Sequence, residues 1–212
     1  MNKDYCSMFD IPINLVFEDR LSGSVLRKLL KNSKRKYLVG FCHNSGGYGW
    51  IKKRTDGFNK AAKGMPYLIL TDLDRSECAP ALLREWRIEN RNHNLLFNVA
   101  VRQVESWVLA CRDRFAEFLG IRTDLIPPSV DDIPNAKKFL MDLVRRSRRR
   151  GLRVDIVPKE GSTARVGPDY NGRLAEFVES QWDPEIAKEY SPSLRRTVEL
   201  LDAFQPVFEN PL

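Results

Sequence analysis

The chain has 212 residues, of which 42% are hydrophobic and 30% charged, and its formal net charge is +7. This length allows one large domain, or one domain with a helical annex, and the composition is typical of a globular protein. No apolar run approaches the roughly 20 residues that span a bilayer. The first residues also lack the apolar core of a signal peptide. We therefore expect a cytoplasmic protein with no membrane partner.

The excess of positive charge favours an anionic partner, and nucleic acid is the first candidate. The cysteines are scattered without a Cys-x-x-Cys pair, and the chain has 2 histidines. This spacing argues against a structural zinc site. Buried free thiols in a reducing compartment are expected instead, at Cys6, Cys42, Cys78 and Cys111.

The first apolar run, residues 11–17, predicts a strand that ends at Glu18. Apolar residues then recur at helical spacing over residues 22–32, with Ser22 or Ser24 as the expected N-cap. This first unit is therefore a strand, a carboxylate and a helix in succession.

A second strand is expected over residues 37–42, followed by a glycine-containing segment, residues 43–50. This segment is either a flexible turn or a loop that brings backbone N–H groups close to a phosphate. The basic run that follows is either a solvated face or a contact for a phosphate backbone, and consists of Lys52, Lys53 and Arg54. A short helix is expected over residues 58–63.

The most informative stretch is residues 65–75, where an apolar run ends in two carboxylates, Asp72 and Asp74. The run from Tyr67 to Leu70 is continuously apolar, which predicts a strand buried on both faces. Residues two apart in extended chain point to the same side, so both carboxylates can face one point and share a divalent cation. The alternative is that Asp72 caps the next helix and Asp74 is a solvated turn residue.

A helix over residues 80–89, a strand over 95–101 and a helix from Val104 to Gly120 complete four strand–helix repeats. This alternation predicts a mainly parallel four-stranded sheet with helices on both faces, forming an α/β core over residues 1–120. Glu105 lies in the first turn of the last helix. It is either a metal-site residue or a helix N-terminal acid that is favoured by the macrodipole.

Residues 121–212 are expected to form a helical extension packed on the core. A proline-containing connector leads to a helix over residues 136–150, and two further helices are expected near 172–181 and 193–204. Five basic residues crowd the end of the 136–150 helix, where cations are favourable in any case. They are also candidates, with Lys159, for contact with a nucleic-acid backbone: Arg145, Arg146, Arg148, Arg149 and Arg150.

The order of these parts resembles the TOPRIM catalytic domain of topoisomerases, primases and overcoming-lysogenization-defect (OLD) family nucleases. More closely, the whole chain resembles a group of small bacterial TOPRIM-like proteins. The resembling segments are Phe17-Glu18-Asp19, Leu70-Thr71-Asp72-Leu73-Asp74-Arg75, Val101-Arg102-Gln103-Val104-Glu105-Ser106-Trp107, Val166-Gly167-Pro168-Asp169-Tyr170-Asn171 and Ser191-Pro192-Ser193-Leu194.

The resemblance implies a TOPRIM-like (Rossmann-like) fold and an acidic cluster that holds Mg²⁺ or Mn²⁺ for chemistry on a phosphodiester. Glu18 would be a metal ligand or general acid/base, and Asp72 and Asp74 metal ligands. Ser22-Gly23-Ser24 stands where the family pattern has a further acid, and Glu105 is the candidate to replace it. The implied function is a metal-dependent nuclease or nuclease subunit acting on DNA or RNA, with Arg75 among its nucleic-acid contacts. The resemblance also implies phage defence with an ABC-type ATPase.

Two alternatives remain open at the level of sequence. One is a non-catalytic nucleic-acid-binding or regulatory subunit with a degenerate TOPRIM site. The other is an Asp-x-Asp enzyme acting on small nucleotides. The sequence leaves homo-oligomerisation and the choice between DNA and RNA undecided.

Overall fold

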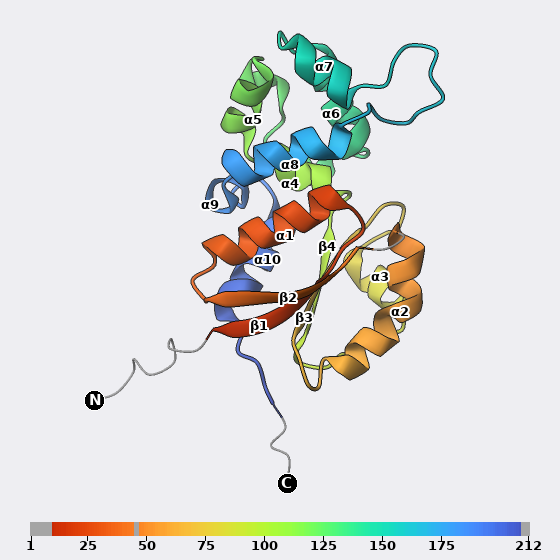
Figure 1. Cartoon of the computed structure of the whole chain (residues 1–212), viewed down its shortest axis with the longest axis vertical. Helices are drawn as coiled ribbons and strands as arrows, with labels where there is room; N and C mark the ends of the chain where they lie inside the picture. Colours follow the sequence, from red (N-terminus) through yellow and green to blue (C-terminus); the bar gives the residue numbers. More distant parts are fainter. Residues whose placement is uncertain (1–9, 45–46, 209–212) are drawn as a thin grey trace, which may run out of the picture.

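The chain folds around an all-parallel four-stranded sheet with the strand order β2-β1-β3-β4 (Figure 1). The structure is a computed structural model that describes residues 10–44 and 47–208. Its strands are β1 (Ile11–Val16), β2 (Tyr37–His43), β3 (Tyr67–Asp72) and β4 (Leu95–Ala100). The predicted α/β class and parallel sheet are thus confirmed. Because β1 and β3 are neighbours at the centre, the acids that follow these strands emerge side by side.

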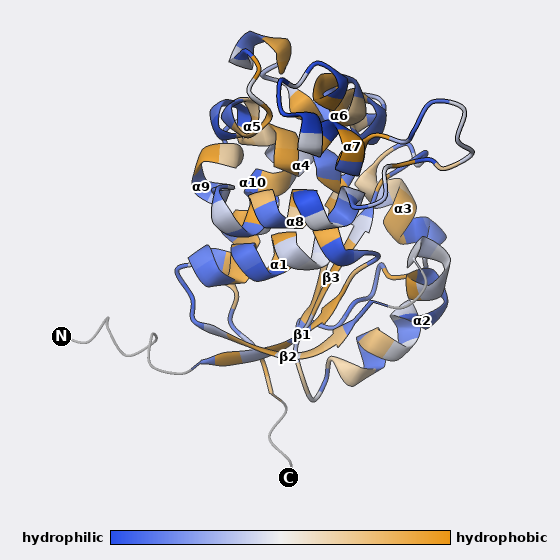
Figure 2. Cartoon of the chain, turned by 45° about the horizontal axis from the view of Figure 1, so that its top comes forward, coloured by the Kyte–Doolittle hydropathy of each residue, from blue (hydrophilic) through white to orange (hydrophobic). Residues whose placement is uncertain are grey.

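Both faces of the sheet are covered by helices. Helix α1 (Arg20–Asn32) covers one face, and α2 (Gly47–Ala61) and α3 (Ala79–Glu85) cover the other. Leu68 and Leu70 of β3 belong to the apolar core on the α1 side, and Ile69 between them belongs to the core on the α2 side. The continuous apolar run of β3 follows from this burial on both faces. Figure 2 shows the apolar strands between helices whose outer faces are hydrophilic.

After β4 the chain is helical. The core on the α1 side continues into this part, where Trp107, Phe115 and Phe177 are fully buried. Ser24 of α1 also donates a hydrogen bond to Glu179 (2.9 Å). The elements are α4 (Val104–Ala110), α5 (Arg112–Leu119), η1 (Thr123–Leu125), η2 (Val130–Asp132), α6 (Ala136–Arg145), α7 (Arg150–Ile156), α8 (Tyr170–Ser180), α9 (Pro184–Ala187) and α10 (Pro192–Ala203).

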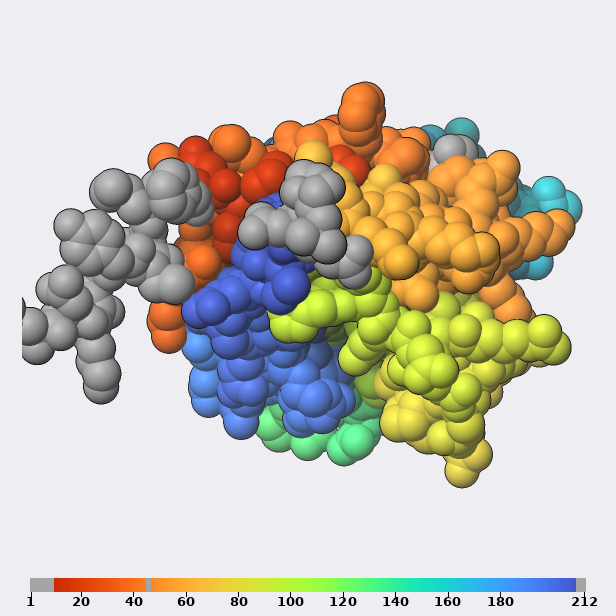
Figure 3. Space-filling model, turned by 90° about the horizontal axis from the view of Figure 1, so that it is seen from below, coloured from red at the N-terminus to blue at the C-terminus, as the bar shows by residue number. Residues whose placement is uncertain are grey.

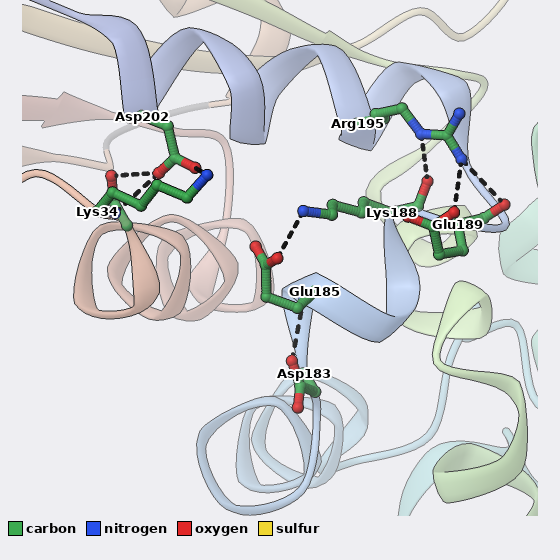
Figure 4. Close-up of polar contacts among 8 residues, drawn as sticks. Lys34, Asp183, Glu185, Lys188, Glu189, Arg195 and Asp202 are labelled. Atoms are coloured by element: carbon green, nitrogen blue, oxygen red, sulfur yellow. Dashed lines mark hydrogen bonds and ion pairs between the residues drawn. The ribbon is translucent and has the colours of Figure 1, made fainter.

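Polar contacts fasten the last helices to each other and to the core (Figure 4). Asp202 of α10 forms an ion pair with Lys34, which follows α1 (3.5 Å), and Arg195 pairs with Glu189 (3.1 Å). These exposed pairs are worth little individually. The burial of Trp107, whose indole N–H donates to Ser193 (2.7 Å), is the stronger link between α4 and α10.

Several local predictions were wrong at element boundaries. Asp19, and neither Ser22 nor Ser24, caps α1, because its carboxylate accepts a hydrogen bond from the Ser22 N–H (2.9 Å). The second half of the segment interpreted as a glycine turn or phosphate loop lies in α2, because Gly47 to Trp50 are helical. Gly46 lies outside the described residues.

The expected short helix over residues 58–63 is the end of α2, and the helix expected over 80–89 ends at Glu85. The helix expected from Val104 to Gly120 is two helices that meet at Cys111, whose backbone (φ −81°, ψ 59°) is not helical. Gly120 closes the second in the left-handed conformation (φ 66°), as its position predicted.

The helix expected over residues 136–150 ends at Arg145, and α7 begins at Arg150. The arginine cluster therefore spans a junction between two helices and does not line the end of one. Cys111 is buried as expected, whereas Cys42 is exposed and Cys78 intermediate. Cys6 lies outside the described residues. None of the helices in the described part of the chain has the length and apolarity that a bilayer crossing requires.

Candidate functional site

The carboxyl edge of the two central strands brings Glu18 against the end of β3. Glu18 follows β1, and its Oε1 accepts hydrogen bonds from the Thr71 hydroxyl (2.7 Å) and the Asp72 backbone N–H (3.2 Å). Burial raises the pKa of Glu18, the two hydrogen bonds oppose this, and the negative charges of Asp74 and Asp19 raise it further. Two acids 54 residues apart in the chain are thus neighbours.

Asp72 is the last residue of β3 and serves as a cap. Its Oδ1 accepts a hydrogen bond from the Val104 N–H (2.9 Å), the first residue of α4. Asp72 therefore caps a helix, as one interpretation of the sequence expected, but this helix is α4 and not α3, the next helix in the chain. Burial, followed by the charges of Glu105, Glu18 and Asp74, raises the pKa of Asp72 well above its ordinary value. The surroundings therefore disfavour the ionised form of Asp72, and a bound cation would stabilise it.

Asp74 lies at the rim of this site. Its φ of 46° shows that the chain leaves extended geometry at this residue. Its charge nevertheless raises the pKa of both Glu18 and Asp72. The Asp74 N–H donates to the Arg102 carbonyl (2.9 Å), and the Arg102 guanidinium donates to the Ser76 carbonyl (2.8 Å). The turn that carries Asp74 is therefore tied to the residues that follow β4.

Glu105 is buried and paired. Its Oε1 accepts a hydrogen bond from the Tyr170 hydroxyl (2.7 Å) and lies 3.3 Å from the Lys137 ammonium, whose nitrogen is 5.1 Å from the centroid of the Tyr170 ring. Burial lowers the pKa of Lys137, but Glu105, Asp19 and Asp72 together raise it above its ordinary value. Burial also raises the pKa of Tyr170, as do the charges of Glu105, Asp19 and Asp72.

Sequence reasoning missed Lys137, because nothing in its surroundings on α6 distinguishes it from a solvated helix residue. Tyr170 lies in one of the resembling segments, and the sequence assigned it no individual role. Both come from the helical extension, so residues 136–171 contribute to the acidic site of the core. The Lys137 ammonium pairs with Glu105 and is close enough to Asp72 for that charge to raise its pKa.

The donor chemistry of Glu18 and Asp72 suits Mg²⁺, which prefers carboxylate oxygens. Each carboxylate uses one oxygen in the hydrogen bonds above. Over residues 10–44 and 47–208, no three His, Cys, Asp or Glu side chains converge as a group that could hold a metal ion. Mg²⁺ usually binds through one or two carboxylates, with water and substrate phosphates completing its shell. The pair therefore fits such an ion, although a closed carboxylate cage is not formed.

The predicted basic residues fall into three places. Arg75 directly follows Asp74 and is exposed beside it. On α2, Lys52 pairs with Glu85 (2.5 Å), Lys53 is exposed, and the Arg54 guanidinium lies over the Trp50 ring (4.5 Å).

The other predicted cations lie around α6 and α7, at the end of the molecule away from β1 and β2 (Figure 1). Arg145 pairs with Asp142 (2.5 Å) and Arg149 donates to the Glu117 carbonyl (3.2 Å). Lys159 and Arg145 line a small cavity of about 300 Å³. The remaining members of the cluster are exposed: Arg146, Arg148 and Arg150.

Comparisons with known protein families, with curated protein sequences and with solved structures find no match to this chain. The class of the protein is therefore defined by its own geometry. It is an α/β protein with a four-stranded parallel sheet of Rossmann-like arrangement, extended by helices, with an acidic site at the carboxyl edge of the central strands. This edge is where open parallel sheets commonly bind ligands.

Proposed function

We propose that the protein is a Mg²⁺-dependent phosphodiester hydrolase, a nuclease or nuclease subunit acting on DNA or RNA. The observation that carries the proposal is the position of the Glu18 carboxylate, which accepts hydrogen bonds from the Thr71 hydroxyl and the Asp72 backbone N–H in a partly buried site. Its charge there is close enough to raise the pKa of Asp72. Burial is the largest cause of the raised pKa values of Glu18 and Asp72, and neighbouring negative charges add to it. A divalent cation would offset both effects.

Glu18 and Asp72 would hold the metal ion, with Asp74 at the rim adding negative charge. When bound, a divalent ion stabilises charge that develops on phosphoryl oxygens and lowers the pKa of a bound water. Lys137 balances the charge of Glu105 and so limits the repulsion that Asp72 experiences. The net charge of +7 favours a polyanionic substrate over a neutral one.

The test is cleavage of labelled single- and double-stranded DNA and RNA by the purified protein with Mg²⁺ or Mn²⁺. Glu18→Gln and Asp72→Asn should each abolish cleavage, because each removes a charged ligand while keeping the size of the side chain. Asp132→Asn is the control, since Asp132 is exposed and lies outside the acidic site. Persistence of cleavage in both site variants would contradict the proposal.

The resemblance to OLD-family nucleases suggests that an ABC-type ATPase is a partner and that the setting is phage defence. The cleavage assay should therefore be repeated with the ATPase encoded beside this protein, where there is one. Absence of cleavage under all these conditions, with or without the ATPase, would remove the nuclease assignment.

A second candidate function is favoured by the packing at the start of α1. Ser22 and Ser24 are buried where the family pattern has an acid, and a Cβ on Gly23 would lie 2.6 Å from the Phe17 ring. This close packing leaves no room for a longer acidic side chain at position 23. A non-catalytic nucleic-acid-binding or regulatory subunit fits this arrangement, and predicts salt-sensitive binding that Asp72→Asn leaves intact without any metal requirement.

A further inference from the structure

A cavity of about 630 Å³ opens beside Asp74. Its walls come from four separate parts of the chain. Tyr48 belongs to the start of α2, Asp74 and Arg75 to the turn after β3, Glu85 to the end of α3, and Arg165 to the loop between α7 and α8. That loop stands out from the helical extension on the side of α2 and α3 (Figures 1 and 2).

Two guanidinium groups in this cavity are available to a ligand. Arg75 and Arg165 are exposed, and neither has a hydrogen-bond or ion-pair partner within the described parts of the chain. The acid on the same wall, Glu85, is neutralised by Lys52 (2.5 Å). Within the lining, the two arginines balance the charges of Asp74 and Glu85, and Lys52 beside Glu85 brings the group to a net charge of +1. The guanidinium groups of Arg75 and Arg165 suit phosphate oxygens, which such groups bind bidentately.

Tyr48 provides an aromatic wall whose position is fixed. Its hydroxyl accepts a hydrogen bond from the Trp86 indole N–H (3.0 Å), and the two rings meet edge to face at a centroid distance of 5.0 Å. Because these contacts hold the ring while leaving it partly exposed, it can serve as a stacking platform for a base.

We propose that this cavity binds a single nucleic-acid strand beside the acidic site, with Arg75 and Arg165 contacting its phosphates and Tyr48 stacking on a base. The identity of the ligand rests on the proposed function. The volume lies within the range of about 300–1,000 Å³ that holds a small ligand, so it accepts one or two unpaired nucleotides. A base that is paired within a duplex cannot reach Tyr48, because its faces are occupied by its neighbours. The strand passes between the α7–α8 loop and α2, so the helical extension takes part in substrate binding.

The experiment measures binding of fluorescently labelled oligo-dT and oligo-rU to the full-length protein by anisotropy, in EDTA so that no cleavage occurs. Arg75→Gln, Arg165→Gln and Tyr48→Leu are compared with wild type over a range of salt concentrations. Arg91→Gln is the matched control, because Arg91 is equally exposed but precedes β4, at the opposite edge of the sheet. Figure 3 shows that edge, where residues 91–97 lie beside the end of α10.

Each arginine substitution should weaken binding about tenfold at low salt and reduce the slope of log K against log salt by about 0.7, the value for one phosphate contact on a single strand. Tyr48→Leu should weaken binding with no change in slope, and Arg91→Gln should change neither quantity. The relative affinities for the two oligomers distinguish DNA from RNA as the ligand.

Wild-type protein that does not bind single strands would overturn the inference. Arginine variants that bind as wild type, or an equal loss in Arg91→Gln, would do the same. The cleavage assay is independent of this result. Binding that depends on the two arginines, without cleavage, would support the cavity as a binding site and contradict the nuclease proposal. Cleavage with binding that does not depend on the arginines would support the nuclease proposal and contradict the cavity as a binding site.

Discussion

Replacing Asp72 with asparagine removes one charge from the acidic site while keeping the oxygen that accepts the Val104 N–H. Burial and the charges of Glu105, Glu18 and Asp74 raise the pKa of Asp72, so its ionisation destabilises the folded state. We therefore expect Asp72→Asn to raise the free energy of unfolding at pH 8, even though it abolishes the proposed activity.

The magnitude follows from proton linkage. The unfolded pKa of an aspartate is about 3.9, and the folded value lies above it. Between these two values the folded state holds more protons, so wild-type stability falls by up to about 1.4 kcal/mol per pH unit as the pH rises. Above the folded pKa the loss is constant, and below about pH 4 it vanishes. The advantage of Asp72→Asn should therefore grow from pH 4 upward and then level off.

Mg²⁺ should reduce this difference in stability. An ion bound at Glu18 and Asp72 stabilises the folded wild type by about 1.4 kcal/mol when its free concentration is ten times its dissociation constant. The variant should gain much less. Urea unfolding, followed by the fluorescence of the buried Trp107 and Trp182, measures both effects over the pH range with and without Mg²⁺. Asp132→Asn is the control for a change of charge at an exposed position.

Two results would refute this reasoning. If Asp72→Asn is no more stable than wild type at pH 8, the surroundings do not disfavour the ionised form of Asp72. If Mg²⁺ stabilises the variant and the wild type equally, the ion does not bind at Asp72.

Three further substitutions test how the site is built. Lys137→Met should lower the free energy of unfolding by roughly 1–3 kcal/mol, because it removes the cation that pairs with the buried charge of Glu105 and leaves the hydrogen bond from Tyr170. Glu105→Gln in the same chain should restore most of the loss in urea unfolding. Arg102→Gln should remove the hydrogen bond to the turn after Asp74 and reduce cleavage more than stability, which should change by about 1 kcal/mol; equal loss of both would indicate a purely structural role. Gly167→Ala should lower the melting temperature, because its Cβ would lie 2.4 Å from a backbone oxygen; an unchanged melting temperature would show that the α7–α8 loop yields easily.

The local structure around the site could be read from sequence where one physical signal dominated. The apolar run of β3 and the alternation of strands with helices predicted the parallel sheet, because burial on both faces demands continuous hydrophobicity. Gly120 marked a helix end, because its left-handed conformation is costly for other residues. Prediction failed where two local signals disagreed. The glycines before Trp50 indicated a loop, whereas the apolar residues of the same segment form the face of α2 that packs on the sheet.

The order of residues determined that acids follow two apolar strands, because this is a local feature of the sequence. The composition determined that cations are in excess, because net charge is a sum over residues. Only the tertiary structure decided that Glu18 contacts Asp72 across 54 residues, that Asp72 caps α4, and that Lys137 reaches Glu105. Those contacts depend on strand order and on where the helical extension packs. Periodicity along the chain carries no information about either, because it reports which face of an element is buried and not which element buries it.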